Sequence, residues 1–349
     1  MWLIQLVGMV GCAERAASSV RDAVTATATA PATTSAPASA PAPSASVSAA
    51  VAATPAPEPS PVKLAFVGDV ALNYSIANDL EAVAEGRGKN IEPGFPFAGV
   101  AERLRAADLA VANLECVLST KGDKDTWHKP FRGPVSGIDV ILASGIDVVS
   151  VANNHSFDFG KEGFDDMLAR LDAKKLAVVG RGYRQKTPHE PEKPWIGEIR
   201  GTRVAVLGFY LEEDGHIERD VAAARKDADI VVAYFHWGKE KQEDATPEQR
   251  RQARLAIDAG ADLVVGSHVH VLQPTEVYRS RLIAYGLGNF VFMGMNTEER
   301  FRRGAILEVT LTKDRLLAFE LVPTRIDDKG APRIVIPESS YLPGKAKQE

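Results

Sequence analysis

Residues 62–69 read VKLAFVGD, an apolar run that ends on a carboxylate, and this arrangement recurs four more times. The later runs are LAVANLE at 109–115, VVSVANNH at 148–155, IVVAYFHWG at 230–238 and LVVGSHVH at 263–270. Each is typical of a buried strand whose last residues can bind metal or exchange protons. Sites in open α/β sheets form where the carboxyl ends of strands converge. The runs therefore predict an α/β fold carrying a metal-dependent active site, in an enzyme or a close relative of one.

Helices are predicted between these strands, and the last part of the chain changes character. Residues 161–174 carry an apolar stripe, and residues 246–259 begin with a capping box formed by Thr246 and Gln249. From 275 to 336 the pattern is strand and turn with no convincing helix. Repeated strand–helix units followed by a β-rich segment predict helices packed on a mixed sheet or on two stacked sheets.

The composition divides the chain into segments. Residues 13–60 consist overwhelmingly of Ala, Pro, Ser and Thr, and such a segment cannot bury enough apolar surface to offset its ordering entropy. We therefore predict a disordered spacer there, a folded domain over 61–325 and a C-terminal tail over 326–349. The formal net charge of −5 and the lack of a long basic run argue against a nucleic-acid partner.

The first twelve residues, MWLIQLVGMVGC, predict a lipoprotein signal peptide. The apolar stretch is too short to span a bilayer, and it ends in a sequence resembling a bacterial lipobox, in which Cys12 would carry lipid. Met9 replaces the usual Leu and no basic residue precedes the apolar core, which a start codon assigned too far downstream would explain. We expect an extracytoplasmic, membrane-anchored bacterial lipoprotein. The alternative is an ordinary flexible N-terminus.

The side chains at the predicted strand ends combine oxygen and imidazole donors. They are Asp69, Glu115, Asn154, His155, His236, His268 and His270. This mixture suits one or two divalent ions of Mn, Fe, Zn or Ni. Each residue also has a structural explanation when taken alone: Asp69 follows Gly68 as in a turn, Glu115 could cap the next element, and His236 could be a buried core histidine. Their shared placement at strand ends favours the site.

Several short motifs resemble the bacterial capsule-synthesis protein family CapA, also called PgsA, of the calcineurin-like metallophosphoesterase superfamily. They are GDVALN (68–73), NLE (113–115), FRGP (131–134), ANNHSFDFG (152–160), HWGKE (236–240), GSHVHVLQ (266–273) and YGLGNFVF (285–292). The resemblance covers about residues 62–295 in the right order. It implies a four-layer α/β/β/α sandwich of the metallophosphoesterase type and a role in poly-γ-glutamate capsule assembly.

The resemblance also implies roles for individual residues. The implied metal ligands are Asp69, Glu115 as the bridging carboxylate, Asn154, His236, His268 and His270. His155 matches the histidine that acts as a general acid, and Asp158 is expected to orient it. Ala71 stands where the superfamily has a further histidine ligand, while Ser267 and Val269 replace the usual His and Pro of the last motif. The second metal position is thus better supported than the first.

Two functions follow from this resemblance. The first is a surface-anchored hydrolase that cleaves a phosphoester or a bond in an envelope polymer, with membrane-bound capsule synthase proteins as partners. The second is a non-catalytic polymer-binding or scaffold component of a capsule synthesis or export complex. Ala71 favours the scaffold because it removes a ligand, whereas retention of His155 favours the enzyme.

Overall fold

The computed structural model of the protein describes residues 60–124, 129–182, 192–210, 214–295, 297–336 and 342–343. The predicted signal peptide and nearly all of the predicted spacer lie outside these residues. None of the described helices is long and apolar enough to cross a membrane.

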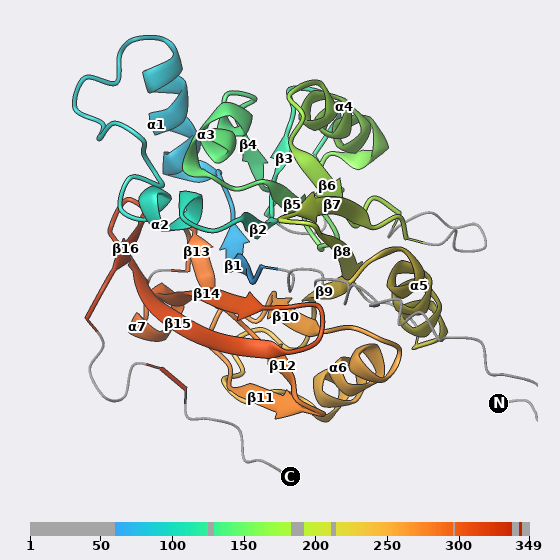
Figure 1. Ribbon diagram of the computed structural model, residues 1–349. Helices are drawn as coiled ribbons and strands as arrows, with labels where there is room; N and C mark the ends of the chain where they lie inside the picture. Colours follow the sequence, from blue (N-terminus) through green and yellow to red (C-terminus); the bar gives the residue numbers. More distant parts are fainter. Residues whose placement is uncertain are drawn as a thin grey trace, which may run out of the picture. The chain divides into compact units, whose positions relative to one another are not determined.

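The larger of the two main sheets is mixed and has eight strands (Figure 1). Its order is β16-β15-β14-β1-β2-β5-β6, and β13 pairs with the end of β1. The strands are β1 (Val62–Val70), β2 (Leu109–Leu114), β5 (Val148–Ser150), β6 (Ala177–Val179), β13 (Asn289–Val291), β14 (Arg303–Leu311), β15 (Leu316–Ile326) and β16 (Pro332–Ile334). β1, β2, β5 and β6 run parallel, so their carboxyl ends lie at one edge of the sheet. β16 carries this sheet beyond residue 325.

The second main sheet has six strands in the order β11-β12-β10-β9-β8-β7. They are β7 (Trp195–Ile199), β8 (Thr202–Tyr210), β9 (Ile230–His236), β10 (Leu263–Ser267), β11 (Thr275–Tyr278) and β12 (Arg281–Ala284). β8, β9, β10 and β12 are parallel. A further two-stranded sheet joins β3 (Val117–Leu118) to β4 (Arg132–Gly133).

Helices cover the outer faces of both main sheets (Figure 1). Four of them pack on the larger sheet: α1 (Tyr74–Ala84), α2 (Ala101–Arg105), α3 (Gly137–Ser144) and α4 (Gly160–Ala173). Two pack on the second sheet: α5 (Asp214–Asp227) and α6 (Pro247–Asp258), which begins with the predicted capping box. A single-turn helix, α7 (Glu299–Arg302), precedes β14. This turn corrects the expectation of no helix between 275 and 336.

Three apolar cores separate the four layers. The core under α1–α4 contains Val67 and Met167, and the core under α5 and α6 contains Val221. The central core lies between the sheets and contains Phe66 and Val206. Neighbouring residues of β1 therefore face different cores, which explains why the strand reads as a continuous apolar run. The predicted α/β/β/α sandwich is confirmed.

The end of β1 is shaped by close backbone contacts. A Cβ atom on Gly68 would lie 1.9 Å from the carbonyl oxygen of Gly288, so only glycine fits there. The pairing of β1 with β2 shifts register between Phe66 and Asp69, and Asp69 then lies between Asn113 of β2 and Asn289 of β13. This irregularity brings the loop before β13 against the strand ends, where the candidate site lies.

Candidate metal centre

Asp69 anchors the site at the end of β1, where its side chain is fully buried. Its Oδ2 atom lies 3.2 Å from Nδ1 of His270, and its Oδ1 atom accepts a 2.8 Å hydrogen bond from the side-chain amide of Asn113. The backbone N–H of His268 is 3.3 Å from Oδ2. Asp69 thus links β1 and β2 to the loop after β10.

Glu115 follows β2 directly, and its carboxylate is the centre of the cluster. Its Oε1 atom is buried, and no described residue hydrogen-bonds to it. Imidazole Nε2 atoms nevertheless surround this oxygen, at 3.9 Å for His155, 3.9 Å for His270 and 4.0 Å for His236. A buried carboxylate oxygen without a donor is costly unless a cation satisfies it. The arrangement is that of ligands around a metal position.

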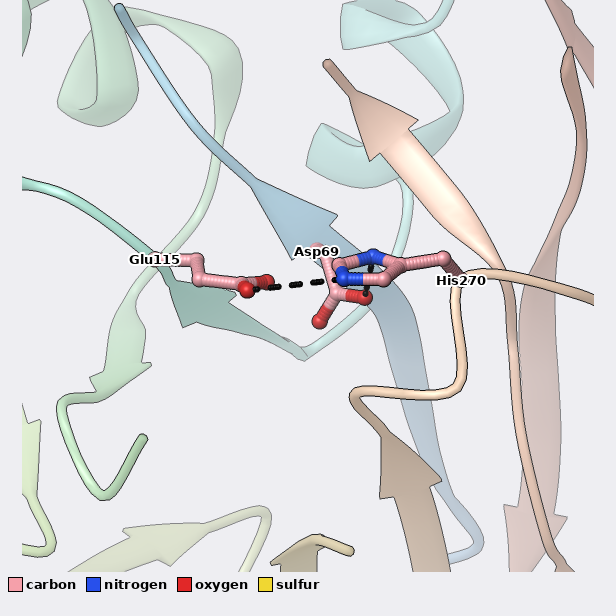
Figure 2. Close-up of side chains that lie close together, drawn as sticks. All are labelled: Asp69, Glu115 and His270. Carbon is pink, nitrogen blue, oxygen red and sulfur yellow. Dashed lines mark ion pairs between the residues drawn. The ribbon is translucent and has the colours of Figure 1, made fainter. Parts of the chain in front are cut away.

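One ligand set is formed by Asp69, Glu115 and His270, whose side chains converge from β1, β2 and the loop after β10 (Figure 2). One donor atom from each lies within 4.8 Å of the others. His270 Nδ1 also lies 2.9 Å from Oδ1 of Asn289. Both neighbours of Nδ1 are acceptors, so Nδ1 carries a proton. Burial opposes a charge on the ring, but contact with Asp69 outweighs it and raises the pKa of His270. When the ring loses its second proton to bind a metal, the Nε2 lone pair faces Glu115.

A second set lies on the side of the second sheet and shares Glu115. His236 ends β9, and its Nε2 atom is 2.8 Å from Oδ1 of Asn154. Two donor atoms bound to one ion at about 2.1 Å and roughly a right angle would be about 3 Å apart, close to this separation. The ring of His268 is 4.5 Å from that of His236, and no described residue hydrogen-bonds its buried Nδ1 atom.

The segment that carries the last two histidines has an unusual backbone. His268 and His270 have positive φ angles of 85° and 59°. Left-handed conformations are unfavourable for residues other than Gly and concentrate at functional sites. These angles place the two imidazoles on a turn and not on an extended strand. The ring centroids are 6.1 Å apart, so each faces its own part of the site.

A network of amides that the sequence analysis did not identify holds the ligands. Asn113 donates to Asp69 and, at 3.3 Å, to Oε2 of Glu115. Asn153 donates to Oδ1 of Asn113 at 3.0 Å and accepts the backbone N–H of His155 at 3.1 Å. Such outer hydrogen bonds orient metal ligands. Asn113 lies within the motif NLE, which was the available signal.

His155 lies where a proton donor for the site is expected. Its Nδ1 atom is 2.7 Å from Oδ2 of Asp158, which also accepts the backbone N–H of Phe131 at 2.6 Å. The phenyl ring of Phe131 stacks on the imidazole at 3.8 Å between centroids. With Nδ1 directed at a carboxylate, the Nε2 atom faces Glu115. Both residues are buried.

The electrostatics of the site agree with cation binding. Burial lowers the pKa of His236 well below its ordinary value and brings that of His268 to about 4, so both rings are neutral and able to bind metal at neutral pH. Burial opposes ionisation of Asp69, but hydrogen bonding and charge from His270 outweigh it and lower the pKa of Asp69. Burial and the charge of Asp69 raise the pKa of Glu115 well above its usual value.

The residues present therefore fit one or two divalent ions. Two atoms of the predicted ligands, Glu115 Oε1 and His268 Nδ1, are buried without a hydrogen-bond partner among the described residues, and a cation would satisfy both. All six predicted ligands and both predicted catalytic residues lie at the ends of strands or in the loops that follow them. Ala71 is buried at the start of the loop after β1 and offers no ligand to the set around Asp69.

A cavity of about 480 Å³ adjoins the metal centre. His236 and His268 form part of its wall, and Lys239, Thr246 and Gln252 also line it. A larger cavity of about 790 Å³ lies among α1, α2 and α3, and none of the predicted site residues lines it. The smaller cavity is thus the space next to the ligands.

A sequence profile of the bacterial capsule synthesis protein PGA_cap matches residues 63–293. The chain belongs to this family. The matched region runs from β1 to just beyond β13 and contains every predicted ligand.

Several curated proteins are similar to this chain in sequence. The PGA biosynthesis protein CapA of Bacillus subtilis is 31% identical over 288 residues, covering 76% of this chain and 71% of that protein. The capsule biosynthesis protein CapA of Bacillus anthracis is 29% identical, covering 69% of this chain and 63% of that protein. A probable polyglutamine synthesis accessory protein of Mycobacterium tuberculosis is 28% identical and covers 63% of this chain and 67% of that protein. The chain thus spans roughly two thirds of these relatives.

Solved structures are similar only in part. A hypothetical protein from Thermus thermophilus aligns with a TM-score of 0.49 at 20% identity, over 75% of this chain and 98% of that one. A phosphatase from Mycoplasma pneumoniae aligns with a TM-score of 0.47 at 13% identity, over 76% of this chain and 93% of that one. These values are too low to support an inference about activity.

Proposed function

We propose that this member of the capsule synthesis family is a metal-dependent hydrolase that cleaves a phosphoester or a bond in an envelope polymer. The observation that carries the proposal is the pairing of His155 with Asp158 beside the metal ligands. A histidine that only fills the core needs neither a carboxylate on Nδ1 nor an Nε2 atom 3.9 Å from the orphaned oxygen of Glu115.

The proposed chemistry divides between the ion and the chain. A divalent ion at Glu115 would supply Lewis acidity towards a phosphoryl or carbonyl oxygen. Asp69 and His270 would hold it on one side, and Asn154 and His236 on the other. Asp158 keeps the proton of His155 on Nδ1 in the neutral ring, and a protonated Nε2 can then donate to the leaving oxygen or nitrogen.

The biological setting is proposed from the relatives. The printed names of the Bacillus proteins concern biosynthesis of a capsule and of PGA. We propose that this chain acts on an envelope polymer of that kind, poly-γ-glutamate, alongside membrane-bound capsule synthase proteins. A lipid on Cys12 would hold the domain at the extracytoplasmic face of the membrane, and residues 13–60 would act as its stalk.

One observation favours a second function, a polymer-binding scaffold without turnover. Ala71 is buried, its backbone N–H bonds to the carbonyl of Val291, and its methyl group supplies no ligand. A site short of one ligand can bind an ion and an anionic polymer without activating a nucleophile. The two functions make opposite predictions for His155.

Complementation of a capsule-deficient strain separates them. His155→Ala should abolish polymer output while the purified protein keeps its metal and its fold. His268→Ala, which removes a ligand, is the matched variant and should lower metal content. If His155→Ala restores full polymer output, the hydrolase is excluded and the scaffold is supported.

A further inference from the structure

The wall of the cavity beside the metal centre contains a cation that the proposed chemistry does not use. Lys239 follows His236 by three residues in the segment after β9, and both line the cavity of about 480 Å³. The Lys239 side chain is exposed, and no described residue forms an ion pair with its amine. Its charge is therefore available to a molecule bound in this cavity, next to the metal-binding histidines.

The other polar groups around this cavity are mostly occupied. Glu248 is bound by Arg251 through hydrogen bonds of 3.0 and 2.6 Å. Thr246 and Gln249 bond to each other in the capping box of α6. The contacts of Arg251 partly neutralise Glu248. The ammonium group of Lys239 remains available to an anion in the cavity.

The first turn of α6 adds to the positive potential of this wall. Thr246 is its N-cap, and Thr246, Glu248 and Gln249 all line the cavity. The N-terminus of a helix carries partial positive charge and favours anions. The same cavity is therefore lined by Lys239, by the N-terminus of α6 and by the metal ligands His236 and His268.

We propose that Lys239 binds a carboxylate of the substrate, next to the bond that is held at the metal centre. That the ligand is a substrate rests on the proposed hydrolase. Binding of a carboxylate by Lys239 does not require turnover. The carboxylate would be one of those that the proposed polymer, poly-γ-glutamate, carries beside its linkages.

Charge matching favours a carboxylate over a second phosphate. No arginine is among the described residues that line this cavity, and the guanidinium of Arg251 is engaged by the carboxylate of Glu248. Phosphate with two negative charges is usually recognised by several cations or by an arginine fork. One ammonium group balances one carboxylate.

The test uses the full-length, metal-loaded protein and two probes of similar shape, one with charged carboxylates and one with neutral carboxamides. One is γ-linked tri-glutamate, and the other is the same peptide with its α-carboxylates converted to carboxamides. Calorimetry should show that the wild type binds the first peptide about tenfold more tightly than the second, the order expected for one charge-assisted contact. Lys239→Met should remove this preference, and Lys239→Arg should retain most of it.

Lys241→Met is the matched control, because Lys241 is also exposed but does not line the cavity. It should bind both peptides as the wild type does. Equal binding of the acid peptide by Lys239→Met and wild type would overturn the proposal, as would a wild type that binds neither peptide or binds both equally. Hydrolysis of bis(p-nitrophenyl) phosphate, measured in parallel, tests the hydrolase separately. If the wild type shows no turnover but its binding depends on Lys239, the carboxylate site is supported and the hydrolase is excluded.

Discussion

His155 and Asp158 lie on one short loop after β5, and 2.7 Å separates Nδ1 of the imidazole from Oδ2 of the carboxylate. Asp158 is itself held by the backbone N–H of Phe131, whose ring stacks on the imidazole. The ring of His155 is therefore fixed in both tilt and tautomer before any ligand arrives. This preorganisation directs its Nε2 atom to the metal ligands.

Asp158→Asn should lower turnover by about 10- to 100-fold, the range seen when the orienting partner of a site histidine is lost. Asn presents an amide or a neutral oxygen to Nδ1, so the ring is no longer held in one tautomer. Steady-state rates on bis(p-nitrophenyl) phosphate would measure the loss, with metal content as the control. Unchanged turnover would show that Asp158 only supports the loop.

Metal binding should be unequal at the two positions. We expect His236→Ala to release more metal than Asp69→Ala, because Ala71 leaves the set around Asp69 one ligand short. Glu115→Gln should weaken both positions, since Glu115 is shared. Elemental analysis after dialysis would measure the ions retained per chain. Two tightly held ions, with Asp69→Ala losing one as readily as His236→Ala does, would contradict this asymmetry.

The stability of the metal-free protein should depend on pH through Glu115. Burial and the charge of Asp69 raise its pKa well above the usual 4.5. A group with a raised folded-state pKa gives stability that is complete below the unfolded pKa and is lost as the pH rises through the folded one. In the presence of chelator, the stability of the wild type relative to Glu115→Gln should therefore fall as the pH rises above about 4.5.

Urea unfolding of both proteins between pH 5 and 8 would measure this difference. Added metal should reduce the pH dependence of the wild type, because a cation stabilises the ionised carboxylate. Parallel stability curves in chelator would mean that Glu115 titrates normally in the fold.

Membrane attachment should depend on Cys12. Acyl chains on this residue would supply the apolar burial that holds the protein in the membrane. Cys12→Ala should move the protein to the soluble fraction of lysed cells, whereas Cys116→Ala, which changes the buried thiol, is the control. A Cys12→Ala protein that stays in the membrane fraction would refute lipidation there.

The sequence predicted the layers of the fold, and the strand ends that carry the candidate site, better than it predicted the helices. Apolar runs such as 62–69 report burial on both faces, so β1, β2 and β9 were placed closely. The sequence predicts helices at 161–174 and 246–259, whereas the pattern gives no comparable signal for α1 or α5. The α5 sequence is polar on average, and only Ile217, Val221 and Ala224 join the core below it. Its helical form depends on tertiary packing that a short pattern does not reveal.

The sequence predicted the residues of the candidate site but not the side chains that contact them and hold them in place. Asp69, Glu115 and the histidines end strands, and strand order alone brings them together. Asn289 belongs to β13, and its approach to His270 depends on the close packing of Gly68 against Gly288. Phe131 reaches His155 from a segment 24 residues away in sequence. Contacts of this kind come from loop conformation, which periodicity does not specify.

Hydrolysis by the His155→Ala protein shows whether His155 acts as a general acid. Wild type and variant are loaded with the same divalent ion, their metal contents are matched, and the rate on bis(p-nitrophenyl) phosphate is measured for each. Loss of a general acid typically costs about 10²–10⁴-fold in rate. The account predicts a loss in this range with equal metal content and an unchanged unfolding midpoint. Equal rates for the two proteins, or no hydrolysis by the metal-loaded wild type, would contradict it.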